Sequence, residues 1–333
     1  TSHYQGGYSG MFSSGNSYWN DLKGNIVIKL VSVFNIFSRG DYYINSLFFN
    51  FIIFFGHVML YRLFIKIYPG SQVWVIMGCF LLPSTLYFSS GIHKDGLVLL
   101  LMAVVIYGVY QSLSKNRISI KRLLFILAGL ILLFLVRNFI LLALLPALFA
   151  WILAAKTKWN TALVFISVYL LGGLAFFNIN AVITKINPPD IIVKKQEAYK
   201  SLPIAATQIE LAALQPTVKS FASNIPQALG HVLFLPYPGQ QPVKSLLPFS
   251  FELYFYLFLL LLLFFFKKKD NLPADKLLMF FTLFFILTVF LFIGYIVPNI
   301  GSLIRYRSLY LPFIITPVLC SLNWEKMRGR FVI

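Results

Sequence analysis

The sequence predicts an all-α membrane protein, a polytopic bundle of transmembrane helices. Hydrophobic residues make up 59% of its 333 residues and charged residues only 11%. The mean hydropathy is +0.80, and long apolar runs recur along the whole chain. A soluble protein of this composition would lack the polar side chains needed to cover its surface. The apolar runs are therefore expected to face lipid.

Nine apolar runs have the character of membrane-spanning helices, and several are shorter than the ~20 residues that cross a bilayer comfortably. Tilted helices with ragged ends are expected for these short runs. The runs lie at about 44–61, 73–89, 96–113, 122–136, 139–155, 160–178, 249–266, 277–296 and 308–322.

Composition divides the chain into four segments. Residues 1–43 form an extracytoplasmic N-terminal arm rich in Gly, Ser, Asn and Tyr, in which Ile26–Phe37 is expected to lie as an interfacial helix. Residues 44–178 form a six-helix transmembrane module. Residues 179–248 form one long extracytoplasmic loop with amphipathic helices, and residues 249–333 form a three-helix module with a cytoplasmic tail.

The distribution of basic residues predicts the orientation of the helices. With alternate connectors assigned to opposite sides, 15 of the 28 Lys and Arg fall on one side, in short connectors or in the C-terminal tail. The positive-inside rule makes this side cytoplasmic. The net charge of +18 then reflects membrane orientation, and no nucleic-acid partner is expected. The fifteen residues are Arg62, Lys66, Lys115, Arg117, Lys121, Arg122, Lys156, Lys158, Lys267, Lys268, Lys269, Lys276, Lys326, Arg328 and Arg330.

Three short connectors on the opposite side also carry basic residues, against the insertion bias. Lys94 lies in the first, Arg137 in the second, and Arg305 and Arg307 flank Tyr306 in the third. Arginine forks and lysine ammonium groups suit phosphate oxygens, so these five residues are predicted to bind the phosphate of a lipid-linked substrate. The alternatives are an Arg137 side chain that snorkels to lipid head groups and an ordinary interfacial anchor at the third connector.

The first of these connectors also carries the candidate catalytic carboxylate, Asp95. A carboxylate near an acceptor hydroxyl can take its proton while the bond to the donor forms. His93 is a candidate to share that proton. Two structural alternatives stay open for Asp95: an ion pair with Lys94 or Arg137, and a cap for the helix that starts near Gly96.

The long outer loop is predicted to hold short amphipathic helices at Ile191–Ser201 and Ile204–Leu214. These helices would act as a lid or help to bind an acceptor. Glu197, Glu210 and His231 are secondary candidates for a polar role there, and the alternative is that they lie on solvated helix faces.

The order of these parts resembles the GT-C class of integral-membrane glycosyltransferases. The resemblance depends on the stretch Pro83–Gly96, which contains Ser-Ser-Gly-x-x-Lys-Asp, on the long outer loop, and on Ile304–Arg307 followed by Pro312. Bacterial exopolysaccharide and O-antigen polymerase-like proteins have similar patterns. The resemblance implies an enzyme of the bacterial inner membrane that uses a polyprenyl-phosphate- or polyprenyl-diphosphate-linked sugar on the extracytoplasmic face. Its acceptor would be a glycan or a lipid, for cell-surface glycan assembly.

The chain departs from that class at its start. GT-C enzymes place the catalytic acid on the outer loop after a first transmembrane helix, and no such helix precedes the N-terminal arm. A tenth helix and an acid upstream of Thr1 are therefore expected. Asp21 is the best stand-in within the sequence and Asp41 the second, and both have an alternative as turn residues. No cofactor is implied with certainty, and assistance by a divalent cation stays open.

Two other classes of function remain as alternatives. One is a transporter or flippase for a lipid-linked or anionic solute, and the other is a non-catalytic membrane subunit of an envelope complex. The sequence has no Walker loop, GxGxxG, HExxH or CxxC motif. Cys79 and Cys320 both lie in apolar runs, as expected of small buried side chains.

Overall fold

The computed structural model describes residues 18–184, 186–203, 205–239, 244–268 and 275–331. About 80% of the structure is helical, and the described residues contain no strand. The predicted all-α class is confirmed. The α-helices are α1 (Tyr18–Ser38), α2 (Tyr42–Ile67), α3 (Gln72–Phe80), α4 (Pro83–Ser89), α5 (Lys94–Ser114), α6 (Ile120–Lys156), α7 (Thr161–Asn178), α8 (Pro188–Lys200), α9 (Val218–Phe234), α10 (Leu247–Phe266), α11 (Lys276–Ile296), α12 (Ile300–Ser308), α13 (Leu311–Ser321) and α14 (Trp324–Phe331).

The described helices identify a membrane protein. Six are long and apolar enough to cross a bilayer: α2, α5, α6, α7, α10 and α11. Two bent pairs, α3 with α4 and α12 with α13, raise the number to eight if each pair crosses once. Two compact units contain these helices. Unit 1 comprises residues 1–59 and 89–141, and unit 2 comprises residues 60–88 and 142–333.

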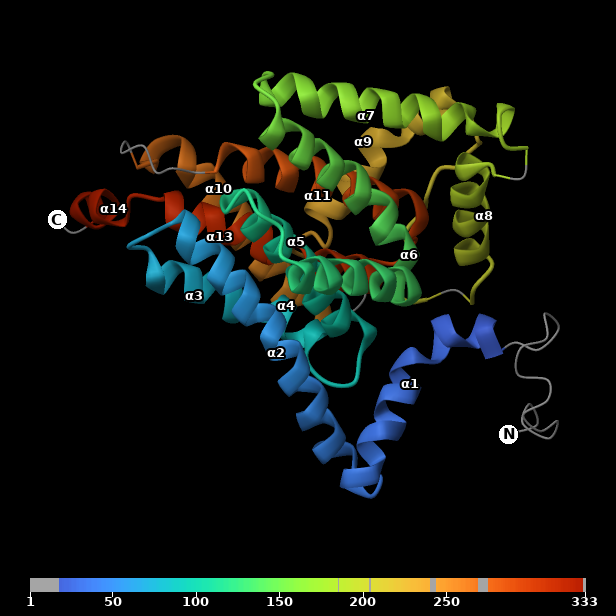
Figure 1. Cartoon of the computed structure of the whole chain (residues 1–333), viewed down its shortest axis with the longest axis horizontal. Helices are drawn as coiled ribbons and strands as arrows, with labels where there is room; N and C mark the ends of the chain where they lie inside the picture. The colour runs from blue at the N-terminus through green and yellow to red at the C-terminus, as the bar shows by residue number, and fades with distance from the viewer. Residues whose placement is uncertain (1–17, 185, 204, 240–243, 269–274, 332–333) are drawn as a thin grey trace. The chain divides into compact units, whose positions relative to one another are not determined.

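In unit 1, α1 and α2 form a V-shaped hairpin (Figure 1). The turn passes through Arg39 and Gly40, whose φ angles of 54° and 86° are both left-handed. Asp41 follows, and its Oδ1 accepts a hydrogen bond from the Ile44 amide at 2.9 Å. Asp41 therefore caps the N-terminus of α2. This agrees with the alternative given above, in which Asp41 is a turn residue.

Apolar side chains hold the hairpin to α5. Phe49 and Ile53 from α2 are buried with Leu97 from α5. Further along, a side chain at Gly56 would meet the Leu100 Cα at 2.7 Å, so glycine permits the close approach of α2 and α5. The α1 residues that pack on this core are Val27, Leu30 and Phe34.

Helix α6 is interrupted at Arg137, which has the non-helical angles φ −152° and ψ 88°. A straight helix of 37 residues would be about 55 Å long, almost twice the ~30 Å of a bilayer's hydrocarbon core. The break divides this length at the residue where the sequence predicts a connector.

In unit 2, α11 packs against α7, α8 and α9, as can be followed in Figure 1. The bent pairs form a second group, in which α13 packs against α3 and α10. The bends measure 45° between α3 and α4 and 60° between α12 and α13. Thr85 in α4 donates a 2.7 Å hydrogen bond to the Ser308 carbonyl at the end of α12, which links the two bent pairs.

The segment from Arg305 to Arg307 was expected to be a connector, and it is helical instead. Asn299 explains the difference, because its side chain accepts a hydrogen bond from the Ser302 amide at 3.0 Å and so starts α12.

The segment between α7 and α10 contains a helix at the first predicted position but not at the second. Helix α8 covers most of Ile191–Ser201. The prediction for Ile204–Leu214 is wrong, since residues 205–214 are not helical. The reason lies in their backbone pairing: the Ile209 amide donates to the Pro298 carbonyl at 2.9 Å, and the Ile300 amide donates to Thr207 at 2.9 Å. The next helix is α9.

The contact between α9 and α11 yields a prediction. A side chain at Gly294 would meet the Ala228 carbonyl carbon at 2.6 Å and its Cα at 2.7 Å, and backbone cannot move aside cheaply. We expect Gly294→Val to destabilise the protein by about 1–3 kcal/mol or more. Thermal unfolding in detergent, followed by tryptophan fluorescence, measures the change. Gly172→Val in α7 is the control, because nothing lies within 4 Å of that position; equal melting temperatures of the two variants would contradict the packing.

Candidate functional site

The connector between α4 and α5 is held in place by α2. Asn50 in α2 accepts a 2.7 Å hydrogen bond from the Gly91 amide. Gly91 has a φ of 77°, a left-handed conformation that suits glycine. Ser89 and the His57 ring lie within hydrogen-bond distance, at 3.4 Å. These contacts fix the point at which α5 begins, with Lys94 as its first residue.

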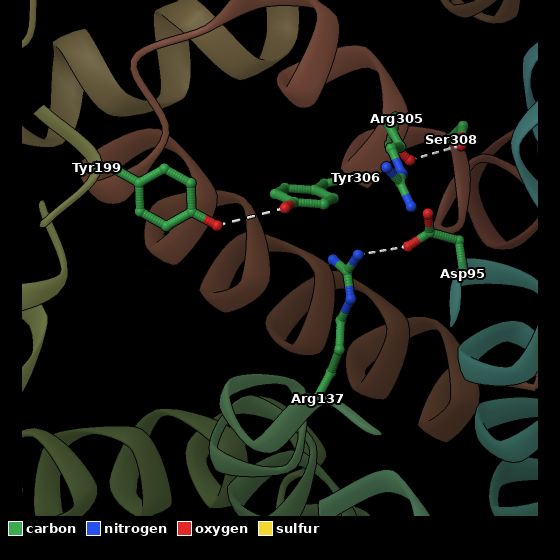
Figure 2. A network of polar contacts seen from close by, with 6 residues as sticks. All are labelled: Asp95, Arg137, Tyr199, Arg305, Tyr306 and Ser308. Atoms are coloured by element: carbon green, nitrogen blue, oxygen red, sulfur yellow. Dashed lines mark hydrogen bonds and ion pairs between the residues drawn. The ribbon is translucent and has the colours of Figure 1, made fainter. Parts of the chain in front are cut away.

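Asp95 lies in the first turn of α5, and its side chain is 0% exposed. Its Oδ1 accepts from Arg137 Nη2 at 2.6 Å (Figure 2), and the Arg137 side chain is 12% exposed. A side chain at the adjacent Gly96 would meet Ser89 and Ile53, so glycine lets α5 pack closely at this point. The negative charge of Asp95 also complements the positive end of the helix dipole.

Of the structural roles considered for Asp95, the ion pair with Arg137 is the one observed. The residue at the cap position of α5 is His93, whose side chain makes no capping hydrogen bond. The pair joins the start of α5 to the break in α6, 42 residues away in sequence. Both charges sit next to apolar helices, where an isolated charge would be costly.

The remaining candidates in unit 1 lie at the surface of the connector or outside the described side chains. His93 is exposed and has an extended backbone, and Lys94 is partly exposed. Asp21 lies in α1, but its side chain is outside the described residues.

The basic residues of α12 in unit 2 divide into two kinds. Arg307 is 4% exposed, and its Nη1 donates to the carbonyls of Val232 and Leu235 at 2.7 and 2.8 Å. These bonds satisfy backbone acceptors at the end of α9, so the geometry favours a structural role for Arg307 over phosphate binding. Arg305 and Tyr306 are partly exposed.

Further contacts are visible on α12 in Figure 2. The Tyr306 hydroxyl lies 3.4 Å from the Tyr199 hydroxyl of α8, and the Arg305 carbonyl accepts from Ser308 Oγ at 2.8 Å. The exposed part of α12 is therefore linked to α8 through two tyrosines.

Sequence reasoning missed Glu252, an acidic residue near the start of the apolar run of α10. The Ser84 amide donates to both of its carboxylate oxygens at 3.1 Å, and the hydroxyls of Ser84 and Tyr256 donate to Oε1 at 3.0 and 2.7 Å. A cavity of about 10 Å³, close to the size of one water molecule, is lined by Glu252, Ser84, Tyr256 and Arg307. Glu252 could have been identified from the sequence as a single acidic residue within a predicted membrane helix.

The secondary candidates Glu197, Glu210 and His231 lie in the segment between α7 and α10. Glu197 and Glu210 are exposed, as the solvated-face alternative expects. His231 in α9 is partly buried, its Nδ1 has no hydrogen-bond partner among the described residues, and burial lowers the pKa of its imidazole from 6.5. No group of three or more His, Cys, Asp or Glu side chains in the described ranges is placed to hold a metal ion.

The structure thus gathers the predicted site residues into two sets. Unit 1 contains Asp21, His93, Lys94, Asp95 and Arg137, and unit 2 contains Arg305, Tyr306 and Arg307. Comparison with family models, curated proteins and solved structures finds no match to this chain.

The buried ion pair predicts a non-additive pattern of stability. We expect Asp95→Leu and Arg137→Met each to lower the free energy of unfolding by about 3–5 kcal/mol, because each removes one member of a buried ion pair. The double variant should recover most of that loss. A double-mutant cycle of melting temperatures in detergent measures the coupling, and additive losses in the double variant would contradict it.

The partial burial of His231 predicts a pH dependence of stability. Its folded-state pKa lies below the unfolded value of 6.5, so the unfolded chain binds the proton first. Stability contributed by the neutral ring is complete above pH 6.5 and declines as the pH falls below it. The difference in melting temperature between the parent and His231→Gln, measured from pH 8 to pH 5, should shrink toward acid. A difference that stays constant over this range would show that the ring does not titrate differently on folding.

Proposed function

We propose that the protein is a membrane glycosyltransferase that takes a sugar from a polyprenyl-phosphate or polyprenyl-diphosphate carrier and transfers it to a glycan or lipid on the extracytoplasmic face. The observation that carries the proposal is the buried Asp95–Arg137 pair, which places a carboxylate and a guanidinium at adjoining helix ends of a membrane protein. Ionisable groups at such positions are costly and commonly functional.

The proposed topology has nine crossings. These are α2, the bent pair α3–α4, α5, the two halves of α6 on either side of Arg137, α7, α10, α11 and the bent pair α12–α13. On this topology the segment between α7 and α10 is the long extracytoplasmic loop. On this topology Lys94 and Arg137 lie on that same side of the bacterial inner membrane, and α12, which carries Arg305, begins there.

The pair suggests how the chemistry would begin. With Asp95 fully buried beneath Arg137, the carboxylate is closed to an acceptor. A carrier phosphate would compete for the guanidinium, because arginine binds phosphate oxygens well. Release of Asp95 would then allow it to accept the proton of the acceptor hydroxyl as the acceptor oxygen bonds to the anomeric carbon of the sugar. The bond between that carbon and the phosphate oxygen breaks, and the phosphate leaves on its lipid with the electron pair. Lys94, next to Asp95 at the start of α5, would add positive charge for the phosphate.

The test is turnover of a radiolabelled polyprenyl-phosphate or polyprenyl-diphosphate sugar by the purified protein. We expect Asp95→Asn to lower kcat by about 100-fold or more, because it removes the base. Arg305→Ala should lower kcat/KM. Lys121→Ala is the matched control, since Lys121 is exposed in α6 and lies outside the proposed site. All variants are compared at equal yield of monodisperse protein.

A parent protein with no turnover and no binding of the carrier would refute the enzyme proposal. Unchanged turnover in Asp95→Asn would instead refute the role of Asp95.

A transporter or flippase is the second candidate, because two bent helix pairs pack together in unit 2. Discontinuous helices of this kind line solute sites in many transporters. Thr85 and Ser308 join the pairs, and Glu252 and Arg307 lie beside them. Movement of a fluorescent lipid-linked sugar from one leaflet of the proteoliposome membrane to the other, with no transfer of the sugar to an acceptor, would favour this candidate.

A further inference from the structure

A cavity of about 900 Å³ runs between α3, α4, α10, α13 and α14 in unit 2. This volume is near the upper end of the range for small-molecule sites. Its walls are mainly apolar and aromatic, and it is separate from the residues of the proposed catalytic site. Lining residues include Trp74, Tyr87, Phe249, Phe255, Leu259 and Trp324.

The walls of this groove are suited to hydrocarbon. Leu81 and Phe255 are 57% and 56% exposed, so the groove opens at side chains that face the bilayer. Glu252 and Ser245 also line it, and the Glu252 carboxylate already accepts hydrogen bonds from Ser84 and Tyr256. From Pro248 to Leu259 the lining follows α10 for roughly 16 Å, at 1.5 Å per residue, which is about half of a ~30 Å hydrocarbon core. Beyond Leu259 the lining continues with Leu319, Trp74 and Trp324, toward the end of α10 at which Lys267 follows.

One end of the groove carries aromatic and basic groups. The rings of Trp74 and Trp324 stack there, with centroids 4.0 Å apart and planes 11° from parallel. Lys326 follows in α14, and its Nζ lies 5.9 Å from the ring centroid of Phe266, the last residue of α10. Lys267 comes next and is exposed.

The backbone fixes these lysines beside the groove. Lys267 forms an isolated bridge with Leu322, and the Lys268 amide donates to the Ser321 carbonyl at 3.0 Å. Leu322 and Phe266 belong to the same apolar cluster as the groove residues Leu259 and Leu319. Glu325 is the acidic residue in the first turn of α14.

We propose that this groove binds one anionic phospholipid, with its hydrocarbon chain along α10 and its phosphate at Lys267, Lys268 and Lys326. Tryptophan at one end marks the depth of the head groups, because indole rings prefer the membrane interface. Lysines at that depth attract anionic lipid. A zwitterionic lipid would fill the same groove with hydrocarbon but would gain less from the lysines.

The head-group assignment is tested by native mass spectrometry of the full chain in detergent, with dioleoyl phosphatidylglycerol and dioleoyl phosphatidylcholine as probes. We expect phosphatidylglycerol to bind at least about tenfold more tightly. Combining Lys267→Ala with Lys326→Ala should remove most of this preference, because each lysine is expected to contribute about fivefold to the affinity for the anionic lipid. The control is Lys158→Ala combined with Lys276→Ala, two exposed lysines of unit 2 outside the groove. Equal affinity for both lipids, or equal effects of the two double variants, would overturn the assignment.

The position of the hydrocarbon chain needs its own variant. Leu81→Trp should fill the groove mouth and weaken both lipids, and Leu170→Trp in α7, at a position 64% exposed, should change neither. Both sites are exposed, so the added rings need not disturb the core. Unaltered binding by monodisperse Leu81→Trp protein would show that the chain lies elsewhere. Neither measurement uses turnover, so this proposal and the proposed function can fail separately.

Discussion

Hydrocarbon offers no hydrogen bonds, so every polar group at membrane depth must find its partner within the protein. This constraint explains the irregular points of the structure. Helix α6 breaks at Arg137, and the guanidinium meets Asp95. Where α12 gives way to α13, the Ser308 carbonyl accepts from the Thr85 hydroxyl. At the end of α9, Arg307 donates to two carbonyls. Each break in a helix is thus matched by a side chain from another element.

The same constraint decides what the sequence can predict. Apolar runs long enough to cross a membrane locate α2, α5, α7, α10 and α11, because such runs have one stable local structure in lipid. An arginine inside an apolar run likewise predicted the interruption at residue 137. Both signals are local in sequence, so the hydropathy of neighbouring residues is sufficient to interpret them.

Contacts between residues distant in sequence could not be predicted from such local patterns. Asp95 had Lys94 and Arg137 as possible partners, and only the packing of α5 and α6 selects Arg137. Residues 205–214 have the composition of an amphipathic helix, yet their backbone pairs with residues 298–300. Gln196 strengthens that arrangement by donating to the Tyr295 carbonyl at 2.7 Å and accepting from the Leu214 amide at 3.0 Å. Tertiary hydrogen bonds here outweigh helical periodicity.

Arg305 and Arg307 show how similar residues acquire different roles from position alone. Two residues along a helix correspond to about 200° of rotation, so the side chains leave α12 on nearly opposite faces. One face is turned toward α9, and there Arg307 is buried against backbone carbonyls. The other leaves Arg305 partly exposed beside a tyrosine pair. A guanidinium already committed to carbonyls can accept a phosphate only by giving up those bonds. Once α12 is known to be a helix, its periodicity therefore separates the two arginines, and the difference between their surroundings follows from their positions along the helix.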